Sequence, residues 1–306
     1  MSRLSAGASS TWLFNALVTV ATWGIWGAFS GLPSQHGFPD TLVYVVWAFT
    51  MIPPALIVLG QAGWKLDRSP SAIAHGLTVG LLGAGGQMVL FYAVTHGPAY
   101  LIFPIISLSP VVTIALSVLF LGERTGRLGV IGIIVALAAL PMFDFVPGAG
   151  WGGGEAWLWP SLIVMLCWGV QAYFMKSANS VMSGESIFFY MMLTGLMLIP
   201  VACLMTDFSK PINFGLEGPW LAAATQVLNA IGALTLVFAF RYGKAIIVAP
   251  LTNAGGPLVT AIISLVALGV LPGWLKATGI ALAVIASLLL AIEPDTEAKE
   301  PILQPE

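Results

Sequence analysis

Residues 93–132 read AVTHGPAYLIFPIISLSPVVTIALSVLFLGERTGRLGVIG, and a related stretch, AFRYGKAIIVAPLTNAGGPLVTAIISLVALGVLPGWLKATG, occupies residues 239–279. The two stretches share residues at a nearly constant shift, with one residue inserted in the second. The shared pairs are Ala93/Ala239, Gly97/Gly243, Ala99/Ala245, Pro104/Pro250, Pro110/Pro257, Val112/Val259, Thr113/Thr260, Ser117/Ser264, Gly122/Gly269 and Gly132/Gly279. Matches over a stretch of this length indicate an internal repeat.

The composition identifies lipid as the solvent of this chain. Only 8% of the 306 residues are charged and 58% are hydrophobic, whereas roughly a quarter of a soluble domain is charged. The net charge of −2 offers no basic surface for a nucleic acid. Cys167 and Cys203 lie inside apolar runs, so we expect buried thiols rather than a disulfide.

The chain contains ten apolar runs of the length that a membrane-spanning helix needs, about 20 residues. We expect these spans at residues 12–32, 40–60, 73–95, 98–120, 128–146, 157–176, 186–205, 219–240, 245–270 and 274–292. The first run is long and does not end in a small-residue cleavage pattern, so it is expected to be a retained helix. Tryptophans at the span ends, Trp12, Trp64, Trp151, Trp157, Trp159, Trp220 and Trp274, are expected to be interfacial anchors.

The placement of Lys and Arg predicts the orientation, because cytoplasmic loops carry an excess of these residues. With a cytoplasmic N-terminus, only Lys210 and Lys276 fall outside. The basic residues inside are Arg3, Lys65, Arg68, Arg124, Arg127, Lys176, Arg241 and Lys244. Residues 1–11 then form a cytoplasmic tail, and residues 294–306 form a polar, disordered cytoplasmic tail. We expect a multi-pass protein of a prokaryotic plasma (inner) membrane.

The repeat extends to the first helix of each half. Thr22-Trp23-Gly24 lies in the first span and Cys167-Trp168-Gly169 in the sixth, a shift of 145 residues. The first five spans therefore correspond to the last five, and because five is odd the second half enters the membrane in the opposite orientation. The expected fold is an all-α polytopic membrane protein of ten helices in two inverted five-helix repeats, residues 12–147 and 156–293. Such proteins hold a site near the midplane between the repeats.

The sequence resembles a known family. Residues 97–123 fit G-x-A-x(4)-P…P-x-x-T-x(3)-S-x(4)-G-E. With the two Trp-Gly pairs and the five-plus-five organisation, this pattern resembles the EamA-like branch of the drug/metabolite transporter (DMT) superfamily. The resemblance implies a small-molecule carrier with a central cavity lined by the first, third, fourth, sixth, eighth and ninth helices. Members move cargoes as different as amino acids, nucleotide sugars, sugar phosphates and choline, so the resemblance names no substrate.

Charged residues and histidines are absent from the middle of every predicted span. A charge at the midplane costs about 2.5–3.5 kcal/mol on insertion scales and is usually functional, so its absence argues against a carboxylate proton relay. The small multidrug-resistance transporters, which resemble one half of this chain, use a Glu in their first helix. The residues that remain form no metal cluster, nucleophile or acid–base pair, so we expect no enzyme, no cofactor and no metal.

The candidate cavity residues are therefore uncharged. They are Trp23, Trp26, Gln87, Ser107, Trp168, Gln171, Asn229 and Asn253. Trp23 and Trp168 are expected to face each other across the two-fold axis, where they can stack on a ligand or hold a cation; the alternative is that each ring only packs at a close helix contact. The amides can bind a polar solute or, alternatively, hydrogen-bond neighbouring helices.

Four prolines lie inside the fourth and ninth spans: Pro104, Pro110, Pro250 and Pro257. Proline removes a backbone hydrogen bond and kinks a helix, so we expect bent helices that line the cavity and absorb its motion. Glu123 and Arg124 follow the fourth span in a cytoplasmic loop. Val270 stands where the second repeat should carry the equivalent of Glu123, and this difference is where the inward and outward gates are expected to differ.

The sequence therefore predicts a secondary transporter, an exporter or exchanger, of a small polar or amphipathic organic metabolite, working by alternating access. Its expected partners are that solute and the lipid bilayer, with no nucleic acid. The alternatives are a membrane receptor or assembly factor that transports nothing, and an intramembrane enzyme.

Overall fold

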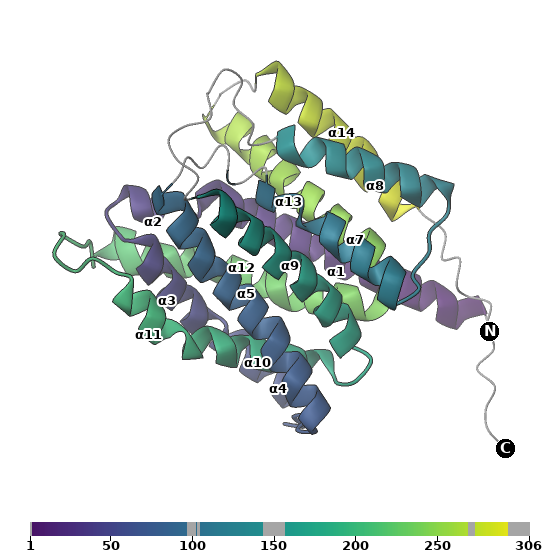
Figure 1. Ribbon diagram of the computed structural model, residues 1–306, viewed down its shortest axis with the longest axis horizontal. Coiled ribbons are helices and arrows are strands. Elements are labelled where there is room, and N and C mark those ends of the chain that lie inside the picture. The colour runs from purple at the N-terminus through teal and green to yellow at the C-terminus, as the bar shows by residue number, and fades with distance from the viewer. Residues whose placement is uncertain (1, 97–101, 103–104, 143–156, 269–272, 293–306) are drawn as a thin grey trace.

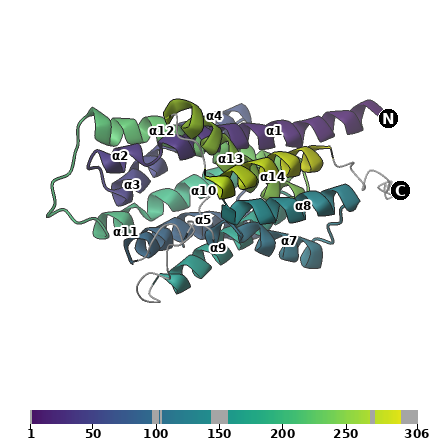
Figure 2. The same ribbon diagram turned by 90° about the horizontal axis from the view of Figure 1, so that it is seen from above.

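The computed structural model describes residues 2–96, 102, 105–142, 157–268 and 273–292, and within these residues all regular structure is helical. The helices are α1 (Ser2–Phe29), α2 (Leu32–Gln35), α3 (Asp40–Thr50), α4 (Ile52–Gln61), α5 (Pro70–His96), α7 (Ser109–Phe120), α8 (Arg127–Ala139), η1 (Leu140–Met142), α9 (Leu158–Ala178), α10 (Gly184–Met197), α11 (Ile199–Leu204), η2 (Leu216–Trp220), α12 (Leu221–Tyr242), α13 (Ala245–Leu268) and α14 (Trp274–Ala291). They run roughly side by side as one bundle (Figures 1 and 2).

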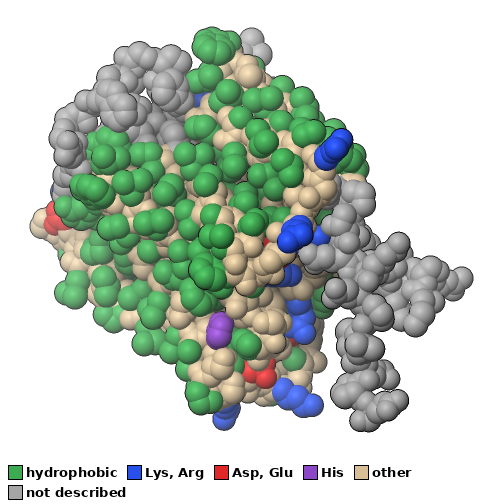
Figure 3. Space-filling model, turned by 45° about the vertical axis from the view of Figure 1, so that its right-hand side comes forward, with side chains coloured by type: hydrophobic (Ala, Val, Ile, Leu, Met, Phe, Trp, Pro, Cys, Tyr) green, Lys and Arg blue, Asp and Glu red, His purple; other side chains and the backbone are tan. Residues whose placement is uncertain are grey.

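Seven helical stretches in the described residues are long and apolar enough to cross a membrane, and three further apolar helices are shorter. The shorter ones are Ser109–Phe120, Arg127–Met142 and Trp274–Leu290. Each of the predicted spans overlaps one of these stretches, although the helix found within the predicted span 98–120 begins only at Ser109. Large apolar side chains such as Leu204 (86% exposed) and Val266 (80% exposed) face outward, and hydrophobic side chains dominate the surface in Figure 3. The protein is an integral, multi-pass membrane protein.

The second span of each repeat is broken, although the sequence predicts continuous helices there. Met51 separates α3 from α4, and Leu198 separates α10 from α11. The break is followed by Pro53 in the first repeat and by Pro200 in the second. Because proline has no N–H and its ring crowds the preceding turn, it ends the hydrogen-bond ladder. Both breaks lie at equivalent positions, as an internal repeat requires.

The first helix of each repeat packs into the opposite repeat. α1 lies against α12 and α13, whereas α9, the first helix of the second repeat, lies against α5 and α7. The fifth helices, α8 and α14, also pack on each other and are side by side in both views (Figures 1 and 2). The two repeats are therefore interlocked through their first helices.

The expected tryptophan belt is only partly present. Trp64, Trp159, Trp220 and Trp274 are exposed, as interfacial anchors should be, but Trp12 and Trp157 are buried. These two residues pack within the apolar interior, so the interpretation of both as anchors is wrong. Trp151 lies outside the described residues.

Candidate functional site

The junction between α1 and the second repeat is built around Trp23-Gly24. The indole Nε1 of Trp23 donates to the backbone carbonyl of Asn229 in α12 at 3.3 Å. The Thr260 hydroxyl of α13 donates to the carbonyl of Gly24 at 2.8 Å. A Cβ atom at Gly24 would lie only 2.3 Å from Cβ of Val259, so glycine is what lets α1 and α13 approach this closely.

The junction between α9 and the first repeat has the same construction. Nε1 of Trp168 donates to the carbonyl of Gly83 in α5 at 3.3 Å. The Thr113 hydroxyl of α7 donates to the carbonyl of Gly169 at 3.0 Å. A Cβ atom at Gly169 would lie 2.5 Å from Cβ of Val112, which is the repeat equivalent of the contact made by Gly24.

The indole rings of Trp23 and Trp168 each pack directly against a glycine. A Cβ atom at Gly86 would lie 2.6 Å from Nε1 of Trp168, and one at Gly232 would lie 2.4 Å from Nε1 of Trp23. Gly86 and Gly232 are separated by the same 146 residues as Gly83 and Asn229, the residues whose carbonyls accept from the indoles. The same ring, carbonyl and glycine are thus assembled twice, once in each repeat.

This geometry supports the packing interpretation of the two Trp-Gly pairs. Both indole N–H groups are occupied by helix carbonyls, and both rings are only half-buried. A role in ligand binding therefore falls to the ring faces. Trp26, one turn further along α1, differs: its Nε1 is buried and has no hydrogen-bond partner among the described residues. Buried N–H groups are rarely unpaired. The indole N–H groups of Trp47 and Trp157 are unpaired in the same way, but among the predicted cavity residues it is Trp26 whose indole N–H has no partner within the described part of the chain.

The predicted amides lie beside these junctions or bond locally. Asn229 donates its side-chain N–H to Gln226 at 3.2 Å, and Asn253 donates to the Ala249 carbonyl one turn earlier at 2.9 Å. Gln171 lies against α5, because a Cβ atom at Gly83 would be 2.2 Å from its Nε2. Gln87 follows in α5, one turn after that glycine, and is half-buried. The structure thus brings Trp23 to Asn229, and Trp168 and Gln171 to one surface of α5. Ser107 is half-buried in the turn before α7.

The prolines fall into different settings. Pro250 and Pro257 lie inside α13. Pro110 was expected inside a continuous fourth helix, but the chain turns at residues 107–108 and Pro110 lies in the first turn of α7. Proline suits this position because the first N–H groups of a helix have no partner within the helix. Pro104 lies outside the described residues.

One face of the molecule collects the basic side chains, which Figure 3 shows along one edge. Lys176 donates to the Gly243 carbonyl at 2.6 Å, and Lys244 donates to the Arg124 carbonyl at 2.9 Å. We call this the basic face; it carries Arg124, Lys176, Arg241 and Lys244. Two helices of the second repeat, α10 and α13, begin at this face. Backbone N–H groups at their starts donate to the acidic side chains of Asp67 and Glu123 in the first repeat.

Asp67, in the loop between α4 and α5, binds the start of α10, which the sequence did not indicate. Its Oδ2 accepts from the N–H and the hydroxyl of Ser183, both at 2.8 Å, and from the Ser186 hydroxyl at 3.0 Å. The N–H of Ser183 is the main reason that the pKa of Asp67 is lowered; the two hydroxyls and the charge of Arg241 act in the same direction, while burial opposes them. The sequence signal that could have marked this helix start is the Ser-x-x-Ser pattern of Ser183 and Ser186.

Glu123 binds the start of α13. It is 6% exposed, and its two carboxylate oxygens accept from the N–H groups of Ala245 and Ile246, each at 3.0 Å. Gly122, with φ at +64°, ends α7 and turns the chain so that the next side chain reaches α13. The Gly-Glu pair is therefore a contact between the repeats. Arg124 joins the same contact through its carbonyl.

Comparisons with known proteins agree with this architecture. A crystal structure of another protein superimposes with a TM-score of 0.74 and 19% identity over 91% of this chain and 98% of that one, which shows the fold. An uncharacterized protein of Methanocaldococcus jannaschii is 31% identical over 85 residues, which span 28% of this chain and 62% of that protein, so the match covers less than two thirds of it. The model of the EamA-like transporter family matches residues 10–143 and again residues 155–292. The chain belongs to the EamA-like transporter family of the DMT superfamily, and each of its two halves is one EamA repeat.

Proposed function

We propose that this protein is a secondary transporter, an exporter or exchanger, of a small polar or amphipathic organic metabolite, and that it works by alternating access between the two inverted repeats. The observation that carries the proposal is the paired junction. The same ring, carbonyl and glycine contact is built twice, once at each of the two crossings between the repeats. Two equivalent arrangements of one contact set give a membrane protein two related end states, open to opposite sides.

We place the solute near the two junctions. The uncharged groups there, with the unpaired N–H of Trp26, provide donors, acceptors and aromatic faces but no formal charge. Such a lining suits a neutral, zwitterionic or quaternary ammonium solute, because aromatic faces hold such cations and amides bind polar groups.

We also propose that both termini and the basic face lie in the cytoplasm of a prokaryotic cell. The excess of Lys and Arg on that face supports this orientation. Thiol-specific labelling of a single cysteine at the exposed position Ser180, in intact cells and in inside-out vesicles, tests it. Labelling of intact cells by an impermeant reagent would reverse the assignment.

The function is tested by uptake into proteoliposomes with a panel of amino acids, sugars and quaternary amines, together with a thermal-shift screen of the same panel. Ligand binding to the folded state raises its apparent stability. We expect at least one solute class to be both transported and stabilising. Neither uptake nor stabilisation with any class would favour a non-transporting membrane protein.

The aromatic faces are tested by Trp23→Ala and Trp168→Ala, with Trp220→Ala as the matched control because Trp220 is exposed away from the junctions. We expect each junction variant to weaken binding of the identified solute and the control to leave it unchanged. Intact binding in both junction variants would exclude the aromatic walls.

A further inference from the structure

Glu123 is a buried acidic side chain that no ligand-binding role explains. Both of its oxygens bind N–H groups in the first turn of α13, where the partial positive charge of a helix terminus favours a carboxylate. The carboxylate belongs to the first repeat and the helix belongs to the second. Hydrogen bonds to an ionised acceptor are shorter and stronger than neutral ones, so this contact holds the two repeats together at the basic face.

A second hydrogen bond joins the two repeats at this place, with its donor in the second repeat and its acceptor in the first. Lys244, the residue before α13, donates to the carbonyl of Arg124 at 2.9 Å. Glu123 itself is fixed to the end of α7, since its N–H donates to the carbonyl of Ser117 at 3.2 Å. The end of α7 therefore cannot leave the start of α13 without breaking the carboxylate bonds and the lysine bond together.

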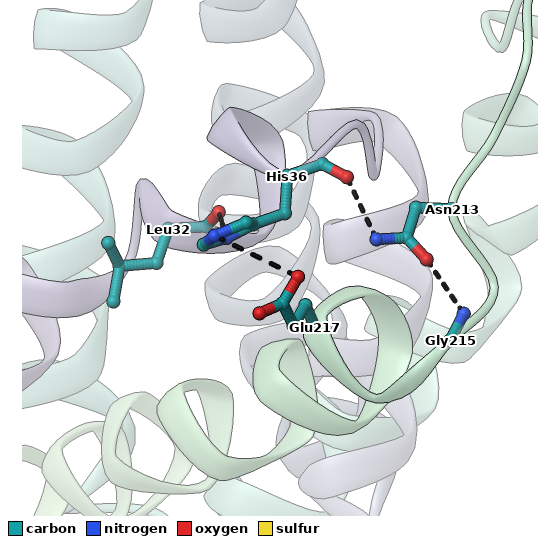
Figure 4. A network of polar contacts seen from close by, with 5 residues as sticks. All are labelled: Leu32, His36, Asn213, Gly215 and Glu217. Carbon is teal, nitrogen blue, oxygen red and sulfur yellow. Dashed lines mark hydrogen bonds and ion pairs between the residues drawn. The ribbon is translucent and has the colours of Figure 1, made fainter.

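At the opposite face, the sequence carries no carboxylate at the position equivalent to Glu123. The repeat equivalent of Glu123 is Val270, which offers no side-chain acceptor; it lies outside the described residues. One contact described on that face joins the α11–α12 connection to the end of α2 (Figure 4). There Asn213 donates to the His36 carbonyl and accepts from the N–H of Gly215, both at 2.9 Å. The same contact includes the pair of His36 Nε2 and Glu217 Oε2 at 4.0 Å. These groups are exposed to water, and exposed pairs of this kind contribute little to stability, whereas the Glu123 carboxylate is buried.

From this asymmetry we propose that Glu123 is a one-sided latch, which keeps the basic face closed and biases the empty protein toward the state open at the opposite face. The proposal rests on the alternating access proposed above. Glu123 acts as a positioning residue: it sets the equilibrium between the two states and does not touch the solute. In each cycle, opening at the basic face requires release of the carboxylate from α13.

Cysteine accessibility measures this opening without a substrate. Ser117 is fully buried one turn before the end of α7, so a Ser117→Cys thiol reacts with a maleimide only when the latch region opens. The parent protein carries Ser117→Cys with Cys167→Ala and Cys203→Ala, purified in detergent. We expect Glu123→Gln to react about tenfold faster or more than the parent, because loss of one hydrogen bond to a charged group shifts an equilibrium by at least about that factor.

The matched control is Glu185→Gln. It removes the same charge from the first turn of α10, which begins on the same face, and we expect the parent's labelling rate. Equal rates for Glu123→Gln and the parent would overturn the latch, and so would equal acceleration by Glu185→Gln. Size-exclusion chromatography verifies that each variant is folded. If Glu123→Gln does not fold, Glu123→Asp takes its place, since a side chain shortened by one methylene cannot reach both N–H groups; it is expected to react faster than the parent, and the parent's rate would again overturn the proposal.

The two proposals fail differently. If no solute is transported but Glu123→Gln still labels faster, the transport function is wrong, whereas Glu123 still keeps the basic face closed. If transport is demonstrated and labelling does not change, the latch is wrong and the transport function stands.

Discussion

Gly85 and Gly86 are neighbours in α5 that meet different surroundings, and this difference tests the indole junction directly. A Cβ atom at Gly86 would lie 2.6 Å from Nε1 and 2.9 Å from Cδ1 of Trp168, whereas one at Gly85 would have nothing within 4 Å. Gly86→Ala must therefore displace the ring and break its bond to the Gly83 carbonyl. Gly85→Ala should be tolerated.

The expected magnitude follows from three contributions. Overpacking costs about 1–3 kcal/mol, and the lost interhelical bond costs about 0.6 kcal/mol in a membrane protein. Both alanines gain up to about 1 kcal/mol of helix propensity, which cancels when the two variants are compared. Gly86→Ala should thus be less stable than Gly85→Ala by about 1.6–3.6 kcal/mol, or at least about 3 °C in the unfolding midpoint.

The assay is thermal unfolding in detergent at one fixed scan rate, followed by intrinsic fluorescence. A rescue variant makes the test specific: Trp168→Leu in the Gly86→Ala protein removes the obstructing ring edge and should recover at least half of the difference from Gly85→Ala. Equal midpoints for the two alanine variants, or no recovery on removing the ring, would refute the packing geometry.

Four further substitutions probe other contacts. Thr113→Val and Thr260→Val each remove one hydrogen bond to a carbonyl of the opposite repeat, so each should lower stability by about 0.6 kcal/mol; a clear inequality in their midpoints would show that the junctions are not equivalent. Gly122→Ala places a side chain at φ +64° and should cost about 1–2 kcal/mol, detectable in the same assay, and no loss would mean that the turn relaxes easily. Since the pKa of Asp67 is lowered in the folded protein, its contribution is complete above the unfolded value of about 3.9 and is lost as pH falls through the lower folded value. Hydrogen exchange at the start of α10 should therefore accelerate only below about pH 4, and Asp67→Asn should abolish that step; an unchanged step would assign it to another group.

Much of the fold followed from the sequence because lipid imposes a simple rule. Each span must be a helix of nearly fixed length, so the apolar runs predicted the helices. The odd number of spans in each repeat predicted that the second repeat is inverted relative to the first. The breaks at Met51 and Leu198 were missed because hydropathy does not register a bend, although Pro53 and Pro200 were visible. Trp12 and Trp157 were misplaced because position along a span does not reveal which side of the helix meets a neighbour.

The candidate site was predicted less completely. Trp23 and Trp168 were chosen as candidates because they occupy equivalent positions in the two repeats. Glu123 was chosen because its equivalent position in the second repeat holds a different residue. The residues that contact these indole rings, such as Gly86 and Asn229, depend on which helices pack against each other. The order of helices in the sequence does not show that α1 packs against the second repeat. The binding of Asp67 to α10 was hidden for the same reason, since the partner lies more than a hundred residues away.

The interlocked first helices have a consequence for biogenesis. α1 leaves the ribosome first, but the helices that cover Trp23 and Gly24 are among the last to be synthesised. Until the second half is synthesised, the surface of α1 around Gly24 therefore faces lipid. The surfaces of α5 and α7 that later contact α9 face lipid as well. Neither half forms a complete folding unit, so we expect the halves expressed separately to be degraded and the halves expressed together to assemble into a stable complex.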